Sequence, residues 1–584
     1  MTEIWQEAFA NRFGDDRFGS DAIGLFALAL RFGVEDLDAV GAESIVGGGD
    51  DKKCDILYFD PDERRCVIAQ CYVSTSKKRL AAPANKASDL NTAVAWLLSK
   101  PLGSLPARLR AGASQIRDAI KDGKLDELYI WYVHNLPESK NVENEISAVE
   151  HTASAAARQI NIDATPRIFA QEFGSKRFDR LYRESESPIL VAGNVDVIVQ
   201  AGFKLSGHGW WAYQTIVPGE FFHSLYKKHG TSLFSANIRD YLGSRSSDSN
   251  INNGIKHTAE TEPKNFWAFN NGITALVNNL TPRKLATGRV RLTLSGISVV
   301  NGAQTTGAIG SLIKKPSKDL QVPVRFIWTN KDEIVEGIVK YNNSQNKISA
   351  SDFRSTDAVQ KRLKLEFEKI PDAEYEGGRR GGASDAIKRR PNLLPSYTVG
   401  QALAAFHGEP VTAYDRKSEI WINDRTYSNF FKDETTATHI VFAYSLFKAI
   451  GGRKVAIVSK TKVGEDLTQI EKAQLDFFEK KGSILLMCAG VSQCLEIILG
   501  KAIPNKFRLS FGLKVSPAAA EELWSTVLEP LFPLVTQLSS AFSTNRVATD
   551  LAKTAIPKFT AIVAAVSQPN SNTFRAFAKK VIVT

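Results

Sequence analysis

The sequence predicts a chain of three parts: an α/β N-terminal domain over residues 1–187, an α+β central domain over 188–400 and a mainly helical region over 401–584. Helix-like and strand-like segments alternate in the first part, and strands broken by Asn/Gly-rich turns fill the second. Amphipathic stretches dominate the third part. A length of 584 residues fits about three domains, and 43% hydrophobic with 23% charged residues excludes a disordered chain.

The first 187 residues are expected to form a helix, a β-hairpin and then alternating helices and strands. The segments CDILYF at 54–59 and CVIAQCYV at 66–73 predict two strands joined by the turn PDERR. Apolar spacing predicts two helices before the hairpin, over 3–13 and 20–32. The elements after the hairpin are helices over 86–99 and 106–121, a strand over 127–135, a helix over 142–158 and a strand over 166–173.

The third part carries no catalytic motif, so we expect it to pack against the central domain or to form an oligomer interface. Its amphipathic stretches predict helices near 436–450, 466–480, 484–500, 517–543 and 548–566.

The lack of a recognisable secretory signal or membrane span predicts a cytoplasmic protein. The N-terminus lacks the basic and apolar regions of a secretory signal, and no apolar run approaches the ~18 residues of a membrane span. Five cysteines without a CxxC pair fit a reducing compartment. We therefore expect no membrane partner.

Charge is distributed unevenly along the chain. Residues 1–60 hold 13 acidic and 5 basic side chains, although the whole chain has a net charge of +11. The acidic block is a source of metal ligands, and the basic remainder suits phosphates.

The predicted hairpin carries the best candidates for metal chemistry. Asp55 opens its first strand, and Gln70 lies in the second strand, where a short turn would bring it beside Asp55. Glu7 on the preceding helix, or Asp50 in the glycine-rich turn, would complete an oxygen ligand set for Mg²⁺ or Mn²⁺.

This order of elements resembles the restriction-endonuclease-like PD-(D/E)XK nuclease core, in the variant with Gln as the second ligand. The resemblance implies a hydrolase that cleaves phosphodiester bonds with a divalent metal. That superfamily has lysine two residues after the Glu or Gln, whereas this chain has Tyr72, which is neutral at pH 7. Lys77 or Lys78 would supply a displaced catalytic cation. The alternative is an inactive fold in which Asp55 caps a turn and Gln70 only pairs in the sheet.

Four ordered asparagine-rich motifs mark the central part. They are NIRDYLG at 237–243, FWAFNNGITALV at 266–277, VVNGAQTTGAI at 299–309 and KYNNSQNKISASDFRS at 340–355. Together they resemble the AIPR family, named for abortive infection and phage resistance, over about 190–400. The resemblance implies antiphage defence, and that family commonly carries a degenerate nuclease-like region ahead of these motifs.

Amide and guanidinium side chains of these motifs are candidates for a ligand groove, because they can bind bases, ribose or phosphate. They are Arg239, Asn270, Asn271, Asn301, Gln304, Asn343, Gln345, Asn346 and Arg354. Arg379 and Arg380, in the glycine-rich basic segment 376–391, are candidates for phosphate contact. The alternatives are turn-stabilising hydrogen-bond networks and a solvated hairpin.

The family resemblance implies antiphage defence, and the residues predict that the protein is a metal-dependent nuclease or a nucleic-acid-binding effector, with DNA favoured over RNA. The alternative is a catalytically inactive scaffold or sensor that binds nucleic acid, a nucleotide signal or a partner protein. The sequence leaves open a homo-oligomer and a partner protein from a defence system.

Overall fold

The protein is described here from a computed structural model, in which the chain divides into two compact units. Unit 1 comprises Met1–Asp179 and Ser349–Thr584, and unit 2 comprises Arg180–Ile348. The structure describes residues 4–14, 17–34, 36–48, 50–76, 79–186, 191–234, 246–331, 334–335, 337–338, 354, 357–375, 377, 392–462 and 464–583. The predicted boundaries at 187 and 400 stay a prediction.

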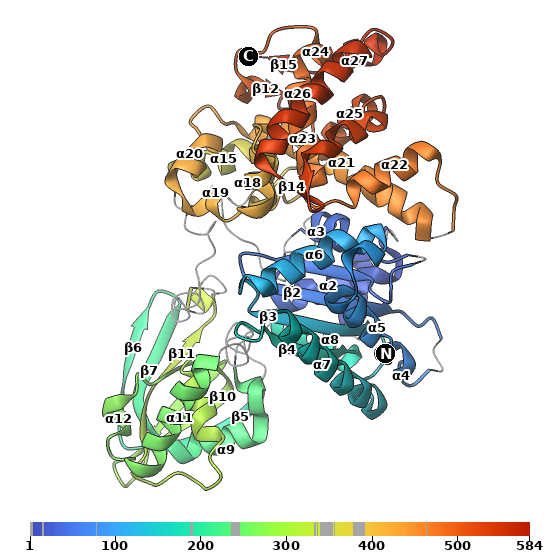
Figure 1. The fold of residues 1–584 in the computed structure, drawn as a ribbon. Coiled ribbons are helices and arrows are strands. Elements are labelled where there is room, and N and C mark those ends of the chain that lie inside the picture. The colour runs from blue at the N-terminus through green and yellow to red at the C-terminus, as the bar shows by residue number, and fades with distance from the viewer. Residues whose placement is uncertain are drawn as a thin grey trace. The chain divides into compact units, whose positions relative to one another are not determined.

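A four-stranded sheet forms the centre of the N-terminal part of unit 1 (Figure 1). Strand β1 (Ile56–Asp60) pairs antiparallel with β2 (Arg65–Tyr72), and β3 (Glu127–His134) and β4 (Arg167–Phe173) follow in parallel. The predicted order of hairpin, helix, strand, helix and strand is confirmed.

Helices cover both faces of this sheet. Helices α1 (Ile4–Phe13) and α2 (Ala22–Phe32) lie on one face, where Phe32 stacks on Trp131 of β3 at 5.4 Å. Helix α8 (Ser175–Glu186) joins this face through Phe178, which stacks on Trp5 at 4.7 Å. The other face packs its apolar residues against α4 (Ala84–Ser88), α5 (Leu90–Val94), α6 (Ala107–Lys121) and α7 (Lys140–Ile160). Helix α3 (Leu37–Ser44), which the sequence pattern does not predict, precedes β1.

The C-terminal part of unit 1 is mainly helical, as predicted, and shares one apolar core. Its helices are α15 (Ala358–Phe367), α17 (Ser396–Phe406), α18 (Pro410–Asp415), α19 (Glu419–Ile422), α20 (Asp424–Phe430), α21 (Ala437–Lys462), α22 (Gln469–Phe478), α23 (Ser483–Gln493), α24 (Leu495–Leu499), α25 (Pro517–Leu528), α26 (Thr549–Ala565) and α27 (Ser571–Ala578). The single helix predicted over 517–543 is wrong. Helix α25 ends at Leu528, and a 3₁₀ segment (Phe532–Ala541) follows, because Pro530 and Pro533 interrupt α-helical hydrogen bonding.

Unit 2 is built on a seven-stranded sheet with helices packed against its apolar face. The strand order is β5-β10-β8-β11-β7-β6, and β9 pairs with β10. The strands are β5 (Val191–Val199), β6 (Gly202–Gly207), β7 (Trp210–Pro218), β8 (Ile273–Leu276), β9 (Asn279–Lys284), β10 (Val290–Asn301) and β11 (Gln321–Thr329). The helices are α9 (Gly219–His229), α11 (Ser246–Thr261), α12 (Phe266–Phe269) and α13 (Ala303–Gly310). No helix in the part of the chain that the structure describes combines the length and apolar character of a membrane span.

The buried His439 and the half-buried His407 form a hydrogen-bonded pair in the helical core of unit 1. His407 Nε2 lies 3.0 Å from His439 Nε2, and His439 Nδ1 lies 3.0 Å from the Leu509 carbonyl. A carbonyl only accepts, so His439 carries its proton on Nδ1 and accepts from His407 through Nε2. Burial lowers the pKa of His407 to about 2, with a further contribution from His439. Burial also lowers the pKa of His439 to about 4.

This pair predicts a loss of stability in mild acid. Below pH 6.5 the unfolded chain protonates both histidines, whereas the folded chain keeps them neutral until pH falls to the lowered pKa values. The free energy of unfolding should therefore fall by up to about 1.4 kcal/mol per pH unit per histidine as pH decreases from 6.5 to 5. Urea unfolding at several pH values measures this slope. His439→Gln should reduce the slope, and His208→Gln, at an exposed turn, should leave it unchanged.

Candidate functional site

Two carboxylates and one thiol meet where α2 begins beside β1 and β2. One ligand atom from each of Asp21, Asp55 and Cys71 lies within 4.8 Å of the other two. Asp21 directly precedes α2 and is 4% exposed, Asp55 directly precedes β1, and Cys71 lies near the end of β2. Among the described residues, no other three His, Cys, Asp or Glu side chains form such a group.

A bend at Asp55 directs its carboxylate to this group. Cys54 and Leu57 both pack in the core against α4–α7, although strict alternation would place residues three apart on opposite faces. The irregularity turns Asp55 to the face that α2 covers, where its Oδ2 accepts a hydrogen bond from the Cys71 amide at 2.7 Å. The carboxylate thus satisfies a backbone donor at the end of the β1–β2 ladder.

Gly47 leaves room between the two carboxylates. A Cβ atom at Gly47 would lie 3.0 Å from Asp21 Oδ2 and 3.0 Å from Asp55 Oδ1. The Gly47 and Val46 amides also donate to the Asp55 carbonyl, at 3.1 and 2.9 Å. The backbone of this loop therefore approaches both carboxylates without a side chain between them.

The donor set fits a divalent metal ion. Carboxylate oxygens are ligands for Mg²⁺ and Mn²⁺, whereas a thiolate is a softer ligand that Mg²⁺ avoids. Asp21, Asp55 and Cys71 together therefore suit Mn²⁺, or another transition metal, better than Mg²⁺.

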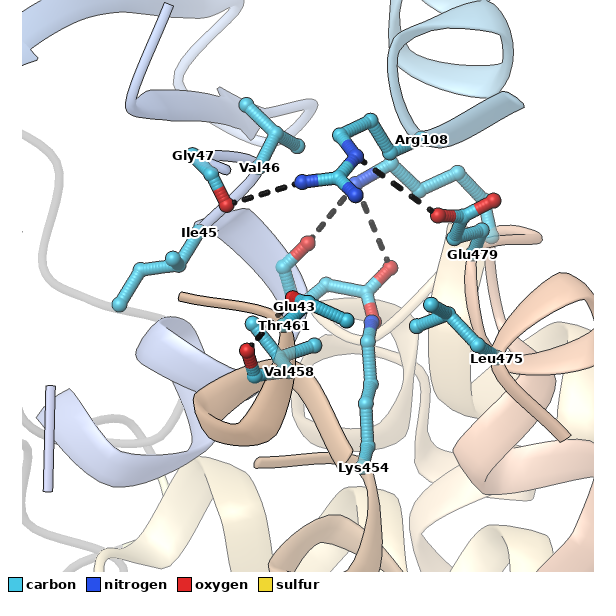
Figure 2. A pocket seen from close by; sticks show the side chains of 11 residues that line it. Glu43, Ile45, Val46, Gly47, Arg108, Lys454, Val458, Thr461, Leu475 and Glu479 are labelled. Carbon is cyan, nitrogen blue, oxygen red and sulfur yellow. Dashed lines mark hydrogen bonds and ion pairs between the residues drawn. The ribbon is translucent and has the colours of Figure 1, made fainter. Parts of the chain in front are cut away.

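Arg108 of α6 contacts the loop of residues 45–48, which follows α3 (Figure 2). Its NH1 donates to the Gly47 carbonyl at 3.1 Å, and its Nε lies 3.9 Å from Glu479 Oε1. Burial raises the pKa of Glu479, while Arg108 opposes that shift. Arg108 thus connects Gly47, beside the carboxylates, to the segment between α22 and α23.

Two lysines of the helical region hold Glu43, which lies in the last turn of α3 directly before this loop; Figure 2 shows Glu43 and Lys454. Lys481 Nζ donates to the Glu43 carbonyl at 3.0 Å and lies 3.5 Å from its Oε1. Lys454 Nζ lies 3.8 Å from Glu43 Oε2, and burial lowers the pKa of Lys454. Within unit 1, the helical region therefore fixes the loop that adjoins Asp21 and Asp55.

Gln70 lies on the other face of the sheet from this group. Cys71 points toward α2, because a Cβ on Gly24 would lie 2.7 Å from its Sγ, and neighbouring side chains in a strand alternate. Gln70 is 5% exposed and pairs in register with Tyr132 of β3. Gln70 Oε1 and the Tyr132 hydroxyl are buried without a hydrogen-bond partner among the described residues. The structure does not bring Gln70 into the Asp55 group.

Cations other than the predicted ones lie beside Tyr72. Arg79 donates a hydrogen bond to the Tyr72 hydroxyl and lies 5.7 Å from the centre of its ring, and Lys86 Nζ lies 5.6 Å from it. Lys77 and Lys78, the predicted displaced cations, lie outside the described residues.

The other two predicted metal-site acids lie apart from the Asp55 group. Glu7 is an exposed residue of α1. Asp50 is also exposed and forms an ion pair with Lys52 at 2.5 Å. Asp21 takes the place predicted for them, and sequence reasoning missed it. The available signal was an acidic residue directly before the apolar helix at 22–30.

The asparagine motifs of unit 2 meet at the start of α13. Thr305 Oγ1 donates to Asn270 Oδ1 at 2.6 Å, and a Cβ on Gly302 would lie 2.6 Å from the Gly272 carbonyl. Asn271 and Asn301 are exposed, and Gln304, in the first turn of α13, is half-buried. Two predicted motifs therefore converge, with Asn270 in the turn-stabilising role and Asn271 and Asn301 open to solvent.

Arg354, a predicted binding residue, contacts other side chains and the backbone of the helical region. Its Nε donates to the Trp421 carbonyl at 2.8 Å, and its guanidinium pairs with Asp424 and lies 4.4 Å from the centre of the Tyr427 ring. The remaining predicted binding residues, Arg239, Asn343, Gln345, Asn346, Arg379 and Arg380, lie outside the described residues.

The loop contacts of Lys481 predict a measurable stabilisation. Lys481→Met should lower the free energy of unfolding by roughly 1–3 kcal/mol, because it leaves the Glu43 carbonyl without its donor and removes one of two cations beside its carboxylate. Lys140→Met is the control, since it breaks an exposed pair with Glu143, which should contribute less than about 1 kcal/mol. Equal urea midpoints for Lys481→Met and the unmodified protein would contradict the assigned role.

One family model matches part of the chain. The family model described as "AIPR protein" matches residues 234–491, a range that contains all four asparagine-rich motifs. Neither the curated proteins nor the solved structures compared with the chain gave a match. The matched range includes part of unit 2 and part of the helical region of unit 1. The match supports the predicted resemblance to the AIPR family, and through it an association with abortive-infection defence against phage.

Proposed function

We propose that the protein acts in antiphage defence and that its N-terminal sheet carries a divalent-metal site for hydrolysis of phosphodiester bonds in nucleic acid. The meeting of Asp21, Asp55 and Cys71 within 4.8 Å carries the proposal. The hairpin followed by parallel strands supports it, because this order resembles the PD-(D/E)XK nuclease core. The AIPR match supports the defence role.

Each part of the site has a defined task in this proposal. A bound Mn²⁺ or Mg²⁺ supplies Lewis acidity at a phosphate oxygen and lowers the pKa of water. Asp21 and Asp55 would hold the ion, and Cys71 would add a softer ligand. Gly47 keeps the space between the carboxylates open, and Arg108 fixes its carbonyl. Asp55 is only half-buried, so a substrate can reach this side of the group.

Asp55→Asn should abolish metal-dependent cleavage while the protein stays folded. The amide keeps an oxygen that can accept from the Cys71 amide, but it loses the charge that binds the metal. Cleavage of single- and double-stranded DNA and RNA is measured with Mg²⁺, Mn²⁺ or EDTA. Asp163→Asn, an exposed change before β4, is the matched control and should keep full activity. Cleavage by Asp55→Asn at the unmodified rate would exclude the site.

A catalytically inactive sensor is the second candidate function, and Tyr72 favours it. The tyrosine stands where the nuclease superfamily has lysine, and Arg79 hydrogen-bonds its hydroxyl. Gln70 also faces away from Asp55, which departs from the superfamily arrangement. In this reading the N-terminal domain binds nucleic acid, a nucleotide signal or a partner protein without cutting.

Tyr72→Lys separates the two functions. If the natural protein lacks only the lysine charge, the variant should gain metal-dependent cleavage, because one charge-stabilising group typically changes the rate by about 10²–10³. Tyr72→Phe removes the hydroxyl without adding charge and serves as the control. If neither the natural protein nor Tyr72→Lys cleaves any nucleic acid with any metal, the sensor function replaces the nuclease.

Nucleic acid, with DNA favoured, is the proposed partner of the central region as well. Asn271, Asn301 and Gln304 remain candidates for contact because they lie at or near the surface of unit 2. Arg379 and Arg380 remain candidates for phosphate contact on the basis of the sequence alone.

A further inference from the structure

Two arginines lie directly opposite each other in the β9–β10 pair of unit 2. Arg283 of β9 pairs in register with Arg291 of β10, and both side chains are exposed. Like charges in directly opposed positions destabilise an antiparallel pair. The fold alone therefore gives no reason for this pairing.

Two more basic residues lie close to this pair in the sequence, at the turn that joins β9 to β10. Lys284 ends β9, and Arg289 precedes β10 in the connecting turn; both are exposed. Lys284 pairs in register with the buried Val290, so it lies on the other face of the sheet from the two arginines. Arg283, Arg289 and Arg291 are called here the β9–β10 basic patch, and none of the three forms an ion pair with any described residue. The acid on the adjacent strand, Asp196 of β5, instead accepts a hydrogen bond from Thr293 Oγ1 at 2.6 Å.

Around the two arginines, the β5, β9 and β10 part of this sheet face carries small polar side chains. One register row holds Asp196, Thr293 and Thr281, and the next holds Asn194, Ser295 and Asn279. Arginine, lysine, serine, threonine and asparagine are the side chains that commonly contact phosphate and sugar oxygens. Large apolar anchors, which a membrane surface would require, are nearly absent from this part, where Ile198 alone stands in the arginine row. The exposed Phe203, Leu205 and Ile216 lie on β6 and β7, at the opposite end of the sheet.

We infer that the β9–β10 basic patch binds the phosphodiester backbone of a nucleic acid without reading its sequence. Guanidinium groups match phosphate oxygens in bidentate geometry, and one bound phosphate between Arg283 and Arg291 removes the repulsion between them. This inference deepens the proposed function, because it gives the substrate a place in unit 2.

Binding in EDTA tests the patch separately from catalysis. Fluorescence anisotropy with a 30-base-pair DNA duplex, a single-stranded DNA and an RNA is measured at several salt concentrations. The test variant is Arg283→Gln/Arg291→Gln, and the matched control is Lys227→Gln/Lys228→Gln, which removes the same charge from exposed positions of α9. The test variant should lower the slope of log affinity against log salt by about 1.8 for the duplex, two contacts at about 0.9 each.

The unbound protein provides a second measurement. Removing the opposed charges should leave the urea midpoint unchanged or raise it, so that weaker binding cannot come from unfolding. A control variant that keeps the unmodified slope supports the patch. An unchanged slope in the test variant, an equal loss in both variants, or no binding of any nucleic acid by the unmodified protein overturns the inference. Binding of both variants to anionic vesicles is measured in parallel. If the test variant loses vesicle binding as much as DNA binding, a membrane surface replaces nucleic acid as the ligand of the patch.

Discussion

The bend between Cys54 and Leu57 decides which side chains meet in the N-terminal domain. Because both residues pack on the α4–α7 side, Asp55 between them turns to the opposite face and bonds the Cys71 amide. A regular strand would direct Asp55 to the face of Gln70, away from Asp21 and Cys71. The candidate metal site, its ligand chemistry and the role of Gly47 all follow from this local irregularity.

The helical region of unit 1 contributes to the same site indirectly, through residues that adjoin it. Lys454 and Lys481 hold Glu43, and Arg108 joins Glu479 to Gly47, so charged side chains of α21 and of the α22–α23 segment fix the end of α3 and the loop that follows it. Such pairs cost desolvation, which the shifted pKa values of Lys454 and Glu479 reflect. The family match spans both elements that supply these groups, which ties the matched region physically to the candidate site.

The sequence predicted the elements of the N-terminal sheet well because alternating and helical apolar periods are local signals. It predicted Asp55 as a candidate site residue for the same reason, since an acid at a strand start is visible in the pattern. The sequence could not show the bend at Asp55. A single irregular residue in a strand changes the sheet face to which its side chain points, and the apolar pattern does not reveal such an irregularity. Asp21 was missed because its approach to Asp55 depends on how α2 packs on the sheet. The sequence likewise could not show that Arg283 lies opposite Arg291, because that pairing depends on the register of β9 against β10.

We propose that Asp21 and Asp55 share a divalent metal ion. A crystal of the full chain soaked in Mn²⁺ tests it most directly, because the anomalous signal of manganese locates the ion independently of activity. We predict one strong peak between the Asp21 and Asp55 carboxylates, within about 2.5 Å of an oxygen of each. The same crystal form of Asp21→Asn should lose this peak. A peak that instead joins Gln70 to other ligands, or no peak at Asp55 at saturating Mn²⁺, would contradict the account.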